Sequence, residues 1–439
     1  MKWIRQRPVE ILLFFSILAC VFEGACRKWI FREVNGPITY SLYFAKDIIF
    51  FAIVMLPGVR NVSRLQGSLK RIFSIALPLI LVGASISAVR DINFVGSLLS
   101  FRALIALPLL AYFTLPRLTG IRIEKVALVI GALTMVNAVL GVVQNTSPVD
   151  ATINYYTSGS SAAAFEQSVR AAGTFSYISG YANLATVGCW SGLVLLALAA
   201  GRLSYIIAGW TFYLSSLVCA LVSISRGVVI TVLLMLLVLA ISGKNVLGKL
   251  VKGISGLGAI LLIGYAFNLN QSVAQWTDIV LERHEASEET IEGRTLGPIM
   301  DIVPATELAP GGLGFGSEQV AGVFADTGAM NLRLFENQFP RLILETGLIG
   351  FAGFLITCSG VLYVMLKARK YVPDDGHRMI CVLSAFLVAS FFFTNIAFNH
   401  IASFFAWIIV AVTLASLPML SSVSAAGKQY AGRMVNAKS

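Results

Sequence analysis

The chain has 439 residues, of which 57% are hydrophobic and only 13% are charged, and its mean hydropathy is +0.81. A soluble core cannot bury that much apolar surface, so the composition excludes a soluble protein and predicts an integral membrane protein. The net charge of +11 is interpreted as a topology signal, and no nucleic-acid partner is expected, because the position of basic residues matters more than their sum in a membrane protein.

The apolar runs are close to 20 residues long and do not alternate like the short strands of a membrane β-barrel. The fold class is therefore predicted to be all-α, with about twelve transmembrane helices, and the first helix is predicted to be retained because its apolar run continues past Cys20. The expected helices lie near residues 9–27, 38–57, 72–89, 92–115, 125–145, 180–201, 203–223, 227–242, 250–267, 339–366, 377–395 and 399–421.

Basic residues favour one orientation of these helices. With the N-terminus in the cytoplasm, 21 of the 33 Lys and Arg residues fall on the inner side, so the positive-inside rule predicts that both termini are cytoplasmic. The chain then divides into residues 1–267 with an external loop at 146–179, a large external loop at 268–338, and residues 339–439 with the last three helices and a cytoplasmic tail. The large loop carries eleven acidic residues against three arginines.

Several charges fall inside or beside apolar spans, where an unpaired charge is costly. Glu23 and Arg27 have the i,i+4 spacing of a helical ion pair, and glycan contact is the alternative. Lys46, Asp47 and Arg102 either pair with one another, extend to the interface, or mark a functional site.

Two arginines come at the outer ends of spans and suit a phosphate ligand. Arg170 opens the sequence Arg-Ala-Ala-Gly-Thr-Phe-Ser-Tyr before the sixth helix, and Arg226 interrupts two apolar spans within Ser-Ile-Ser-Arg-Gly. A guanidinium can bind phosphate through two hydrogen bonds, and Gly227 is expected to allow close backbone approach. The alternative is an arginine that rests among the lipid head groups.

Other motifs point to no cofactor. The glycine run of residues 311–316 has neither the strand-helix context nor the Gly-Lys-Ser of a nucleotide loop, and it is interpreted as a turn, either flexible or placed near a ligand. The acidic residues at 285, 288, 289 and 292 are read as a solvated helix face in preference to a cation site. The three histidines match no metal or triad pattern, so no metal and no cofactor are predicted.

Taken together, four motifs resemble the superfamily of bacterial O-antigen ligases and O-antigen polymerases. They are residues 170–175, Ser225-Arg226-Gly227, the glycine run, and the sequence from Glu336-Asn337 through Glu345-Thr346-Gly347 to Gly350. The resemblance implies a GT-C-like glycosyltransferase of the bacterial inner membrane with one large periplasmic loop. Its donor would be a glycan linked to undecaprenyl diphosphate, and a flippase and a chain-length regulator would be possible partners.

Site residues follow from the same resemblance. Arg226 and Arg170 would bind the diphosphate, with Arg294 and Arg341 as further members, and Glu345 would contribute to substrate binding. Family members often have His-Asn where this chain has Glu336-Asn337, so Glu336 is the candidate base or orients the acceptor hydroxyl, with Asn337 beside it and His284 as a weak substitute. Arginines would stabilise the departing diphosphate, and a carboxylate would accept the acceptor's proton.

Three functions are therefore carried forward. The first is a polymerase that extends lipid-linked repeat units for an exopolysaccharide or O-antigen. The second is a ligase that transfers a finished glycan to a lipid or protein acceptor, which the absent histidine disfavours. The third is a glycan transporter or flippase, which the intramembrane charges favour and the lack of a repeat or a long central loop disfavours.

Overall fold

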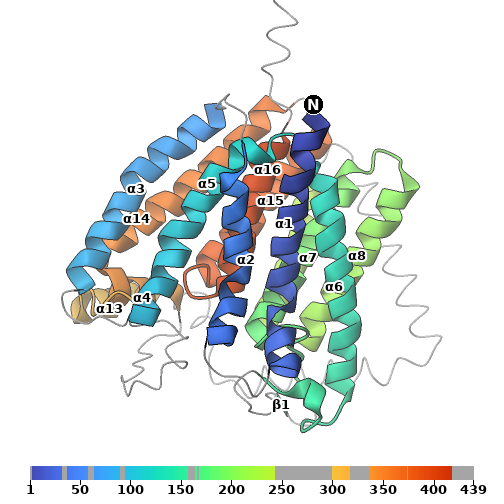
Figure 1. Cartoon of the computed structure of the whole chain (residues 1–439), viewed down its shortest axis with the longest axis horizontal. Helices are drawn as coiled ribbons and strands as arrows, with labels where there is room; N and C mark the ends of the chain where they lie inside the picture. The colour runs from blue at the N-terminus through green and yellow to red at the C-terminus, as the bar shows by residue number, and fades with distance from the viewer. Residues whose placement is uncertain are drawn as a thin grey trace, which may run out of the picture.

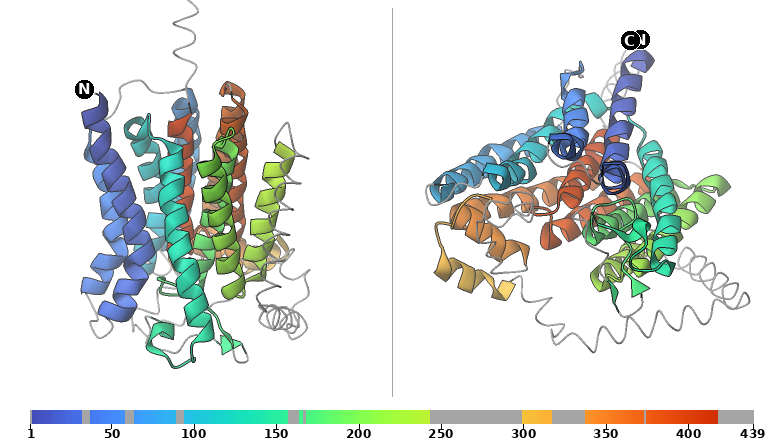
Figure 2. Two further views of the ribbon diagram at one scale, coloured as in Figure 1. Left: turned by 90° about the vertical axis from the view of Figure 1, so that its right-hand side faces the viewer. Right: turned by 60° about the horizontal axis from the view of Figure 1, so that its bottom comes forward.

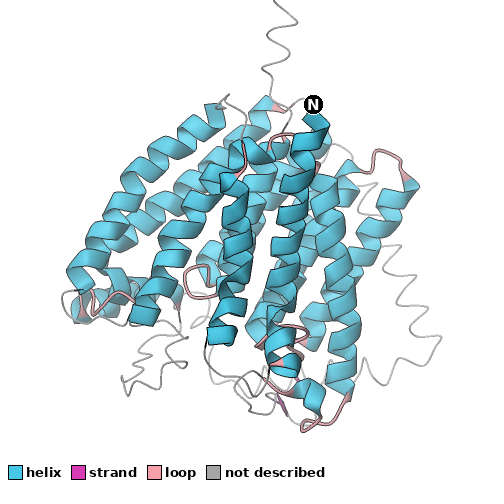
Figure 3. Ribbon diagram, viewed as in Figure 1, coloured by secondary structure: helices cyan, strands magenta, loops and turns pink. Residues whose placement is uncertain are grey.

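The protein is a bundle of α-helices that run roughly parallel to one another (Figures 1 and 3). The computed structural model describes residues 2–31, 37–57, 64–88, 94–156, 164–165, 168–242, 299–316, 337–372 and 374–417. The only strands in these ranges form a minimal antiparallel hairpin, in which β1 (Ala164–Phe165) pairs with β2 (Ser168–Val169).

The first half of the chain alternates between the two ends of the bundle. It contains α1 (Lys2–Ala25), α2 (Pro37–Met55), α3 (Arg64–Ala88), α4 (Phe94–Phe101), α5 (Leu107–Leu118) and α6 (Ile123–Thr146). Two π-helical segments, Cys26–Ile30 after α1 and Arg102–Ala106 between α4 and α5, each contain a buried basic residue. The span expected at 92–115 is thus a continuous helical rod with a π-helical centre at Arg102.

The second half begins with a short 3-10 turn (Thr152–Asn154) and the hairpin. It continues with α7 (Ile178–Leu198), α8 (Leu203–Val222), α9 (Arg226–Ser242), α13 (Ile302–Leu308), α14 (Gln338–Ala368), a 3-10 turn (Arg369–Tyr371), α15 (Asp375–Thr394) and α16 (His400–Ser416). A four-residue turn joins α7 to α8, as the sequence predicts for two spans with almost no linker.

The prediction of a helical membrane protein is confirmed. Within the described ranges, eight helical stretches are long and apolar enough to cross a bilayer, and α9 and α16 are shorter apolar helices. Helix α2 carries Lys46 and Asp47 among apolar residues. The helix expected at 250–267 lies outside the described residues, and the total of twelve spans stays a prediction.

The core of the bundle lies around α7 and α16, which are buried along most of their length. One polar chain crosses this core: the Trp190 indole nitrogen donates to Ser384 Oγ at 2.8 Å, and Thr413 Oγ1 donates to the same oxygen at 2.9 Å. Satisfied polar groups of this kind connect helices where no water is present. They hold α7, α15 and α16 in fixed register.

Helices α3 and α14 pack side by side and form an arm at the left of Figure 1. Glycines bring their backbones close: a β-carbon on Gly83 would lie 2.3 Å from the Thr346 carbonyl oxygen, and one on Gly353 would lie 2.6 Å from that of Ala76. Small residues serve this purpose in membrane helix pairs, where packing replaces the hydrophobic effect. The outer surface of the arm exposes apolar side chains such as Ile75 and Tyr363.

The bundle has two ends, and the described candidate site residues lie toward one of them. We call the end where α1 begins the N-terminal face, and the end where β1 and α13 lie the far face (Figures 1 and 2). The α7–α8 turn and the 3-10 turn before α15 belong to the N-terminal face. The loop 170–177, the α8–α9 turn, residues 299–316, the start of α14 and the turn 395–399 belong to the far face.

Candidate functional site

A rigid loop at the far face carries Arg170. The side chain of Gln144 on α6 accepts hydrogen bonds from the amides of Ala172 at 3.1 Å and Gly173 at 2.7 Å, and it donates to the Gly173 carbonyl at 3.3 Å. Two helical turns earlier on α6, Asn137 Oδ1 accepts hydrogen bonds from the Thr174 amide and hydroxyl, both at 3.0 Å. Two buried amides on one face of α6 therefore fix the conformation of the loop that follows Arg170.

The same loop is joined to the α8–α9 turn, which carries Arg226. Arg170 Nε donates to the Ser223 carbonyl at 3.3 Å, and the Ala171 amide donates to the Val222 carbonyl at 3.0 Å. Burial lowers the pKa of the half-buried Arg170 guanidinium, which nevertheless stays charged at neutral pH because arginine starts so high. The structure thus places Arg170 against the turn that leads into Arg226, although they lie far apart in sequence.

The α8–α9 turn itself is strained. Ile224 has a φ of 49°, which is a rare conformation for a β-branched residue, and its amide donates to Leu221 at 2.8 Å. Strain of about 1–3 kcal/mol persists only where surrounding contacts enforce it. The contacts with Arg170 and Ala171 supply that enforcement, and they leave Arg226 as the first residue of α9.

Gly227 lies beside open space, so its expected role in close backbone approach stays a prediction. Among the described residues, nothing lies within 4 Å of the position that a β-carbon on Gly227 would take. No close backbone contact explains this glycine, because the described chain leaves open space beside it.

The start of α14 brings together the second group of predicted residues. Asn337 precedes the helix and donates from Nδ2 to Asp301 Oδ2 at 3.0 Å. One turn into the helix, the buried guanidinium of Arg341 lies 4.0 Å from the ring centroid of Phe398. Glu345 is fully buried, and its Oε2 accepts from Ser100 Oγ at 2.7 Å. Asn337, Arg341 and Glu345 therefore project from successive turns of one short helical stretch.

That stretch ends at a break in α14. Gly347 has a φ of 64° and a ψ of −178°, a backbone region that is essentially restricted to glycine. The glycine run packs against the break, where the Leu348 amide donates to the Pro310 carbonyl at 3.0 Å and the Leu313 amide donates to the Leu344 carbonyl at 2.6 Å. The run is a packed turn built into the far face, and the alternative of a plain flexible turn is not supported.

A buried network of charges joins the far-face ends of α1 and α16 to the middle of α2. Glu23 forms ion pairs with Arg27 at 3.0 Å and Lys46 at 2.9 Å, and its carboxylate lies 3.6 Å from the His400 ring nitrogen. The Glu23–Arg27 pair predicted from its spacing is confirmed. The Lys46 ammonium also donates to the Tyr43 carbonyl and lies 4.5 Å from the centroid of the Tyr43 ring.

A second buried pair lies beside the first. Arg102 donates from Nε and Nη2 to the two carboxylate oxygens of Asp47, at 2.6 and 2.9 Å. Such two-point pairing is the strongest geometry available to an arginine and a carboxylate. Asp47 and Arg102 therefore show the mutual pairing that the sequence left open, whereas Lys46 pairs with Glu23 instead.

These groups are connected across the far face. Ser100 contacts Glu345, and two residues later Arg102 contacts Asp47. The turn 395–399 makes a second link, because Phe398 lies on Arg341 while His400 lies beside Glu23. The loop after Arg170 makes a third, since Lys28 donates to the Gly173 carbonyl at 2.7 Å and Arg27 lies 3.5 Å from Ser176 Oγ.

The predicted site residues therefore form two described groups, Arg170 with the Arg226 turn and Asn337 with Arg341 and Glu345, joined by a buried charged network. Glu336, Arg294 and His284 lie outside the described residues. Sequence reasoning missed Gln144 and Asn137, although two amides seven positions apart in an apolar helix are a recognisable signal. It also missed Ser100 and Asp301, which carry no local signal.

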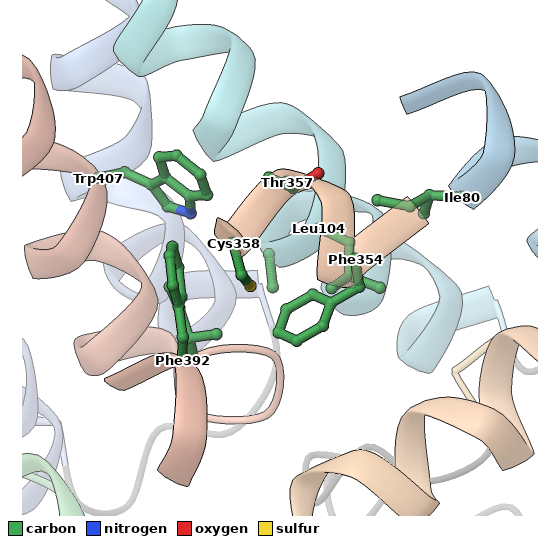
Figure 4. A pocket seen from close by; sticks show the side chains of 9 residues that line it. Ile80, Leu104, Phe354, Thr357, Cys358, Phe392 and Trp407 are labelled. Atoms are coloured by element: carbon green, nitrogen blue, oxygen red, sulfur yellow. The ribbon is translucent and has the colours of Figure 1, made fainter. Parts of the chain in front are cut away.

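A metal centre is not found among the described residues, where no three His, Cys, Asp or Glu side chains gather as ligands. The acidic residues at 285–292 lie outside these ranges. A small apolar pocket, with room for about one water molecule, begins one residue along the chain from Arg102, at Ala103 (Figure 4). Its lining includes Leu104, Phe354, Cys358 and Trp407, so it does not suit a charged group.

Comparisons with known proteins leave the family open. No protein-family model matches the chain, and no curated protein matches it. Function therefore has to be argued from the geometry of the far face.

Proposed function

We propose that the protein polymerises oligosaccharide repeat units carried on undecaprenyl diphosphate, at the far face of the bacterial inner membrane. The observation that carries the proposal is the attachment of Arg170 to the α8–α9 turn, which gathers two arginine-bearing segments at the outer ends of membrane spans. Under the proposed orientation the far face is periplasmic, with the start of α1 in the cytoplasm. The GT-C-like fold and the count of twelve spans belong to the same proposal.

Transfer of a glycan from a lipid diphosphate requires positive charge beside the departing diphosphate. When the anomeric carbon is attacked, the bond to the diphosphate oxygen breaks and negative charge develops on that oxygen. Arginines that are already oriented stabilise this charge without reorganising, and a hydrogen bond to a charged group contributes roughly 1.5–3 kcal/mol. Arg226 and Arg170 are assigned to the diphosphate, because the pinned loop holds Arg170 in place before any ligand binds.

Arg341 and Arg294 are proposed as further diphosphate or glycan ligands. The Arg341 guanidinium lies against the Phe398 ring, one turn along α14 from Asn337, which places its charge beside the proposed acceptor site. Glu345 was predicted to contribute to substrate binding. Its complete burial and its bond to Ser100 favour a positioning role within the first stretch of α14 instead.

A base must accept the proton of the acceptor hydroxyl as the new glycosidic bond forms. Glu336 is proposed for this role and Asn337 for orienting the acceptor, since the bond from Asn337 to Asp301 fixes the chain at that point. The proton passes from the acceptor oxygen to the carboxylate, and the electron pair of the broken bond leaves with the diphosphate. Neither a metal nor a nucleotide is needed to balance this step.

The test compares three variants in cells that lack the native protein. Arg226→Ala and Arg170→Ala should insert normally but yield only single repeat units, while Arg226→Lys should retain charge and recover part of the chain length. The matched control is Arg202→Ala, which removes an arginine from the α7–α8 turn at the N-terminal face and should leave polymer length unchanged. Normal polymer in both alanine variants would refute the assignment of the diphosphate site.

The accumulating lipid-linked product separates polymerase from ligase. A polymerase null mutant should accumulate undecaprenyl diphosphate carrying one repeat unit, whereas a ligase null mutant should accumulate full-length polymer on the same lipid. Glu336→Gln tests the base separately, because it removes the charge at nearly constant volume. Full activity in that variant would refute the assigned base while leaving the polymerase proposal intact.

A transporter or flippase is the second candidate, and the buried ionic network favours it. Charged side chains within membrane spans commonly mark transport pathways, and Glu23, Lys46, Asp47 and Arg102 form such a group. Their mutual pairing also suits a structural role. Purified protein in vesicles decides between them: movement of lipid-linked oligosaccharide across the bilayer without a new glycosidic bond would support transport.

A further inference from the structure

Helix α13 exposes an apolar surface at the far face. Val303 and Leu308 on the helix are 60% and 54% exposed, and Ile299 and Met300 just before it are 61% and 66% exposed. These four side chains come from a segment of ten residues, within a region whose sequence predicts a polar external loop. Contiguous exposed apolar side chains of this kind mark a contact surface.

The opposite side of α13 packs against the body of the protein. Ala305 and Ala309 are completely buried, and the segment that follows bonds to α14 through the Leu313 and Leu348 amides. Asp301, before the helix, is bonded to Asn337. The body of the protein therefore fixes the rotation of α13 and directs Val303 and Leu308 away from the bundle.

Helix α13 lies beside apolar residues of α3 and α14 that are exposed on the outside of the bundle. The Leu348 amide, which bonds to the Pro310 carbonyl just after α13, belongs to the first turn of α14 beyond the break, where Leu348 and Ile349 are exposed apolar residues. A β-carbon on Gly311 would lie 3.8 Å from Ile86, near the end of α3 and also exposed. Figures 1 and 2 show α13 at this end of the α3–α14 arm.

We propose that α13 is an interfacial helix that binds the lipid surface, with Ile299, Met300, Val303 and Leu308 in the boundary between head groups and acyl chains. The occupant is lipid because the apolar patch is continuous with the outward surface of α3 and α14, which faces the bilayer. Such a helix lies in the membrane plane and buries its apolar side by about 5–10 Å. Glu307, also exposed on α13, then reaches toward the head groups and water.

The proposal gives the large loop a fixed attachment to the membrane. Asp301 and Asn337 meet at the start of α13, so the lipid contact sets the height of the first turn of α14 above the acyl chains. Under the proposed function, the bond to be formed lies at the level of a lipid diphosphate. The lipid contact itself rests only on the exposed side chains and the position of α13.

Spin labels can test the contact directly. Single cysteines replace Val303 and Leu308 in a Cys26→Ser background, because the other five native cysteines are buried. Each variant is reconstituted in vesicles of phosphatidylethanolamine and phosphatidylglycerol, and collisions with oxygen and with a water-soluble nickel chelate are measured. Asp150→Cys, on an exposed far-face loop, is the aqueous control, and Ile356→Cys on α14 is the lipid control.

Labels at both α13 positions should collide with the nickel chelate several-fold less often than the label at position 150, and with oxygen nearly as often as the label at position 356. Chelate access equal to that at position 150 would overturn the proposal. Protection that disappears as the protein is diluted in lipid would also overturn it, because a second copy would then be the occupant. The readout needs no activity, so it succeeds or fails independently of the polymerase assays.

Discussion

The paired charges of Asp47 and Arg102 offer the sharpest test of how the far-face network contributes to stability. Both side chains are nearly buried, with exposures of 12% and 7%, and two hydrogen bonds join them. Asp47→Leu would leave the guanidinium buried without its carboxylate, at a cost of about 3–5 kcal/mol. Arg102→Met should cost a similar amount by isolating the carboxylate.

The double variant is expected to behave differently. Asp47→Leu combined with Arg102→Met removes both charges and fills their volume with apolar groups, so its free energy of unfolding should lie within about 1 kcal/mol of the native value or above it. The measurement is reversible unfolding in mixed micelles with increasing sodium dodecyl sulfate. A double-mutant cycle then isolates the energy of the pair.

The pair of Arg122 and Glu124, which is open to solvent on its arginine side, is the matched control. Its atoms are also 2.6 Å apart, but the side chains of Arg122 and Glu124 are 58% and 17% exposed, so Glu124→Gln should change stability by no more than about 1 kcal/mol. If Asp47→Leu proved as mild as Glu124→Gln, the pair would not experience a low-dielectric surrounding. Burial would then not account for the strength of the Asp47–Arg102 pair.

Three further predictions concern single positions. Gly347→Ala should destabilise the protein by about 1–3 kcal/mol in the same micelle assay, because a β-carbon there is strained and would lie 2.8 Å from the Gly311 carbonyl carbon. The control is Gly67→Ala within α3, where a β-carbon meets nothing within 4 Å, so it should be neutral or stabilise by up to about 1 kcal/mol. Gln144→Met removes the acceptor of the hydrogen bonds from the Ala172 and Gly173 amides, so hydrogen exchange at these two amides should become faster. Gln144→Glu keeps an acceptor oxygen and should protect them in part. Unchanged exchange in the methionine variant would show that other contacts hold the loop after Arg170. Burial acts to raise the pKa of Asp374, but hydrogen bonds from His377 outweigh burial and leave that pKa below its ordinary value. The ionised Asp374 therefore caps and stabilises α15 at neutral pH, and this stabilisation is lost as the pH falls through the lowered pKa. Asp374→Ala should cost about 0.5–2 kcal/mol at neutral pH and little in acid, and an equal loss at both pH values would contradict the cap.

Most helix positions could be predicted from hydropathy because each span is a long apolar run with polar ends. The helix expected at 125–145 is Ile123–Thr146, and the one expected at 180–201 is Ile178–Leu198. The start of α3 was placed too late, at residue 72 instead of Arg64, because Lys70 and Arg71 lower the hydropathy of a turn that is still helical. Hydropathy marks only the apolar part of a helix, and a helix such as α3 can extend beyond that part by several residues.

The contacts within the candidate site are harder to predict from the sequence, because most of them join residues far apart in the chain. Glu23 and Arg27 are four positions apart, so their pairing follows from local helix geometry. The partners Asp47 and Arg102 are 55 positions apart, and only the packing of two helices brings them together. The break at Gly347 is equally hidden, because a single glycine in an apolar run is compatible with a straight membrane helix.

The two π-helical segments have a consequence for the permitted length of the chain. In each one an amide bonds to a carbonyl five positions earlier, Phe31 to Cys26 and Leu107 to Arg102, so each accommodates one residue more than an α-helical turn. Deleting one residue there would restore ordinary helix geometry and keep the flanking helical segments in nearly the same orientation, but it would remove the bulge that holds these basic residues. Arg27, Lys28 and Arg102 would then leave their buried positions, although no sequence elsewhere had changed. Single-residue deletions should therefore be more harmful within these segments than in the loops that join the spans, because the bulge itself positions the basic residues of the charged network.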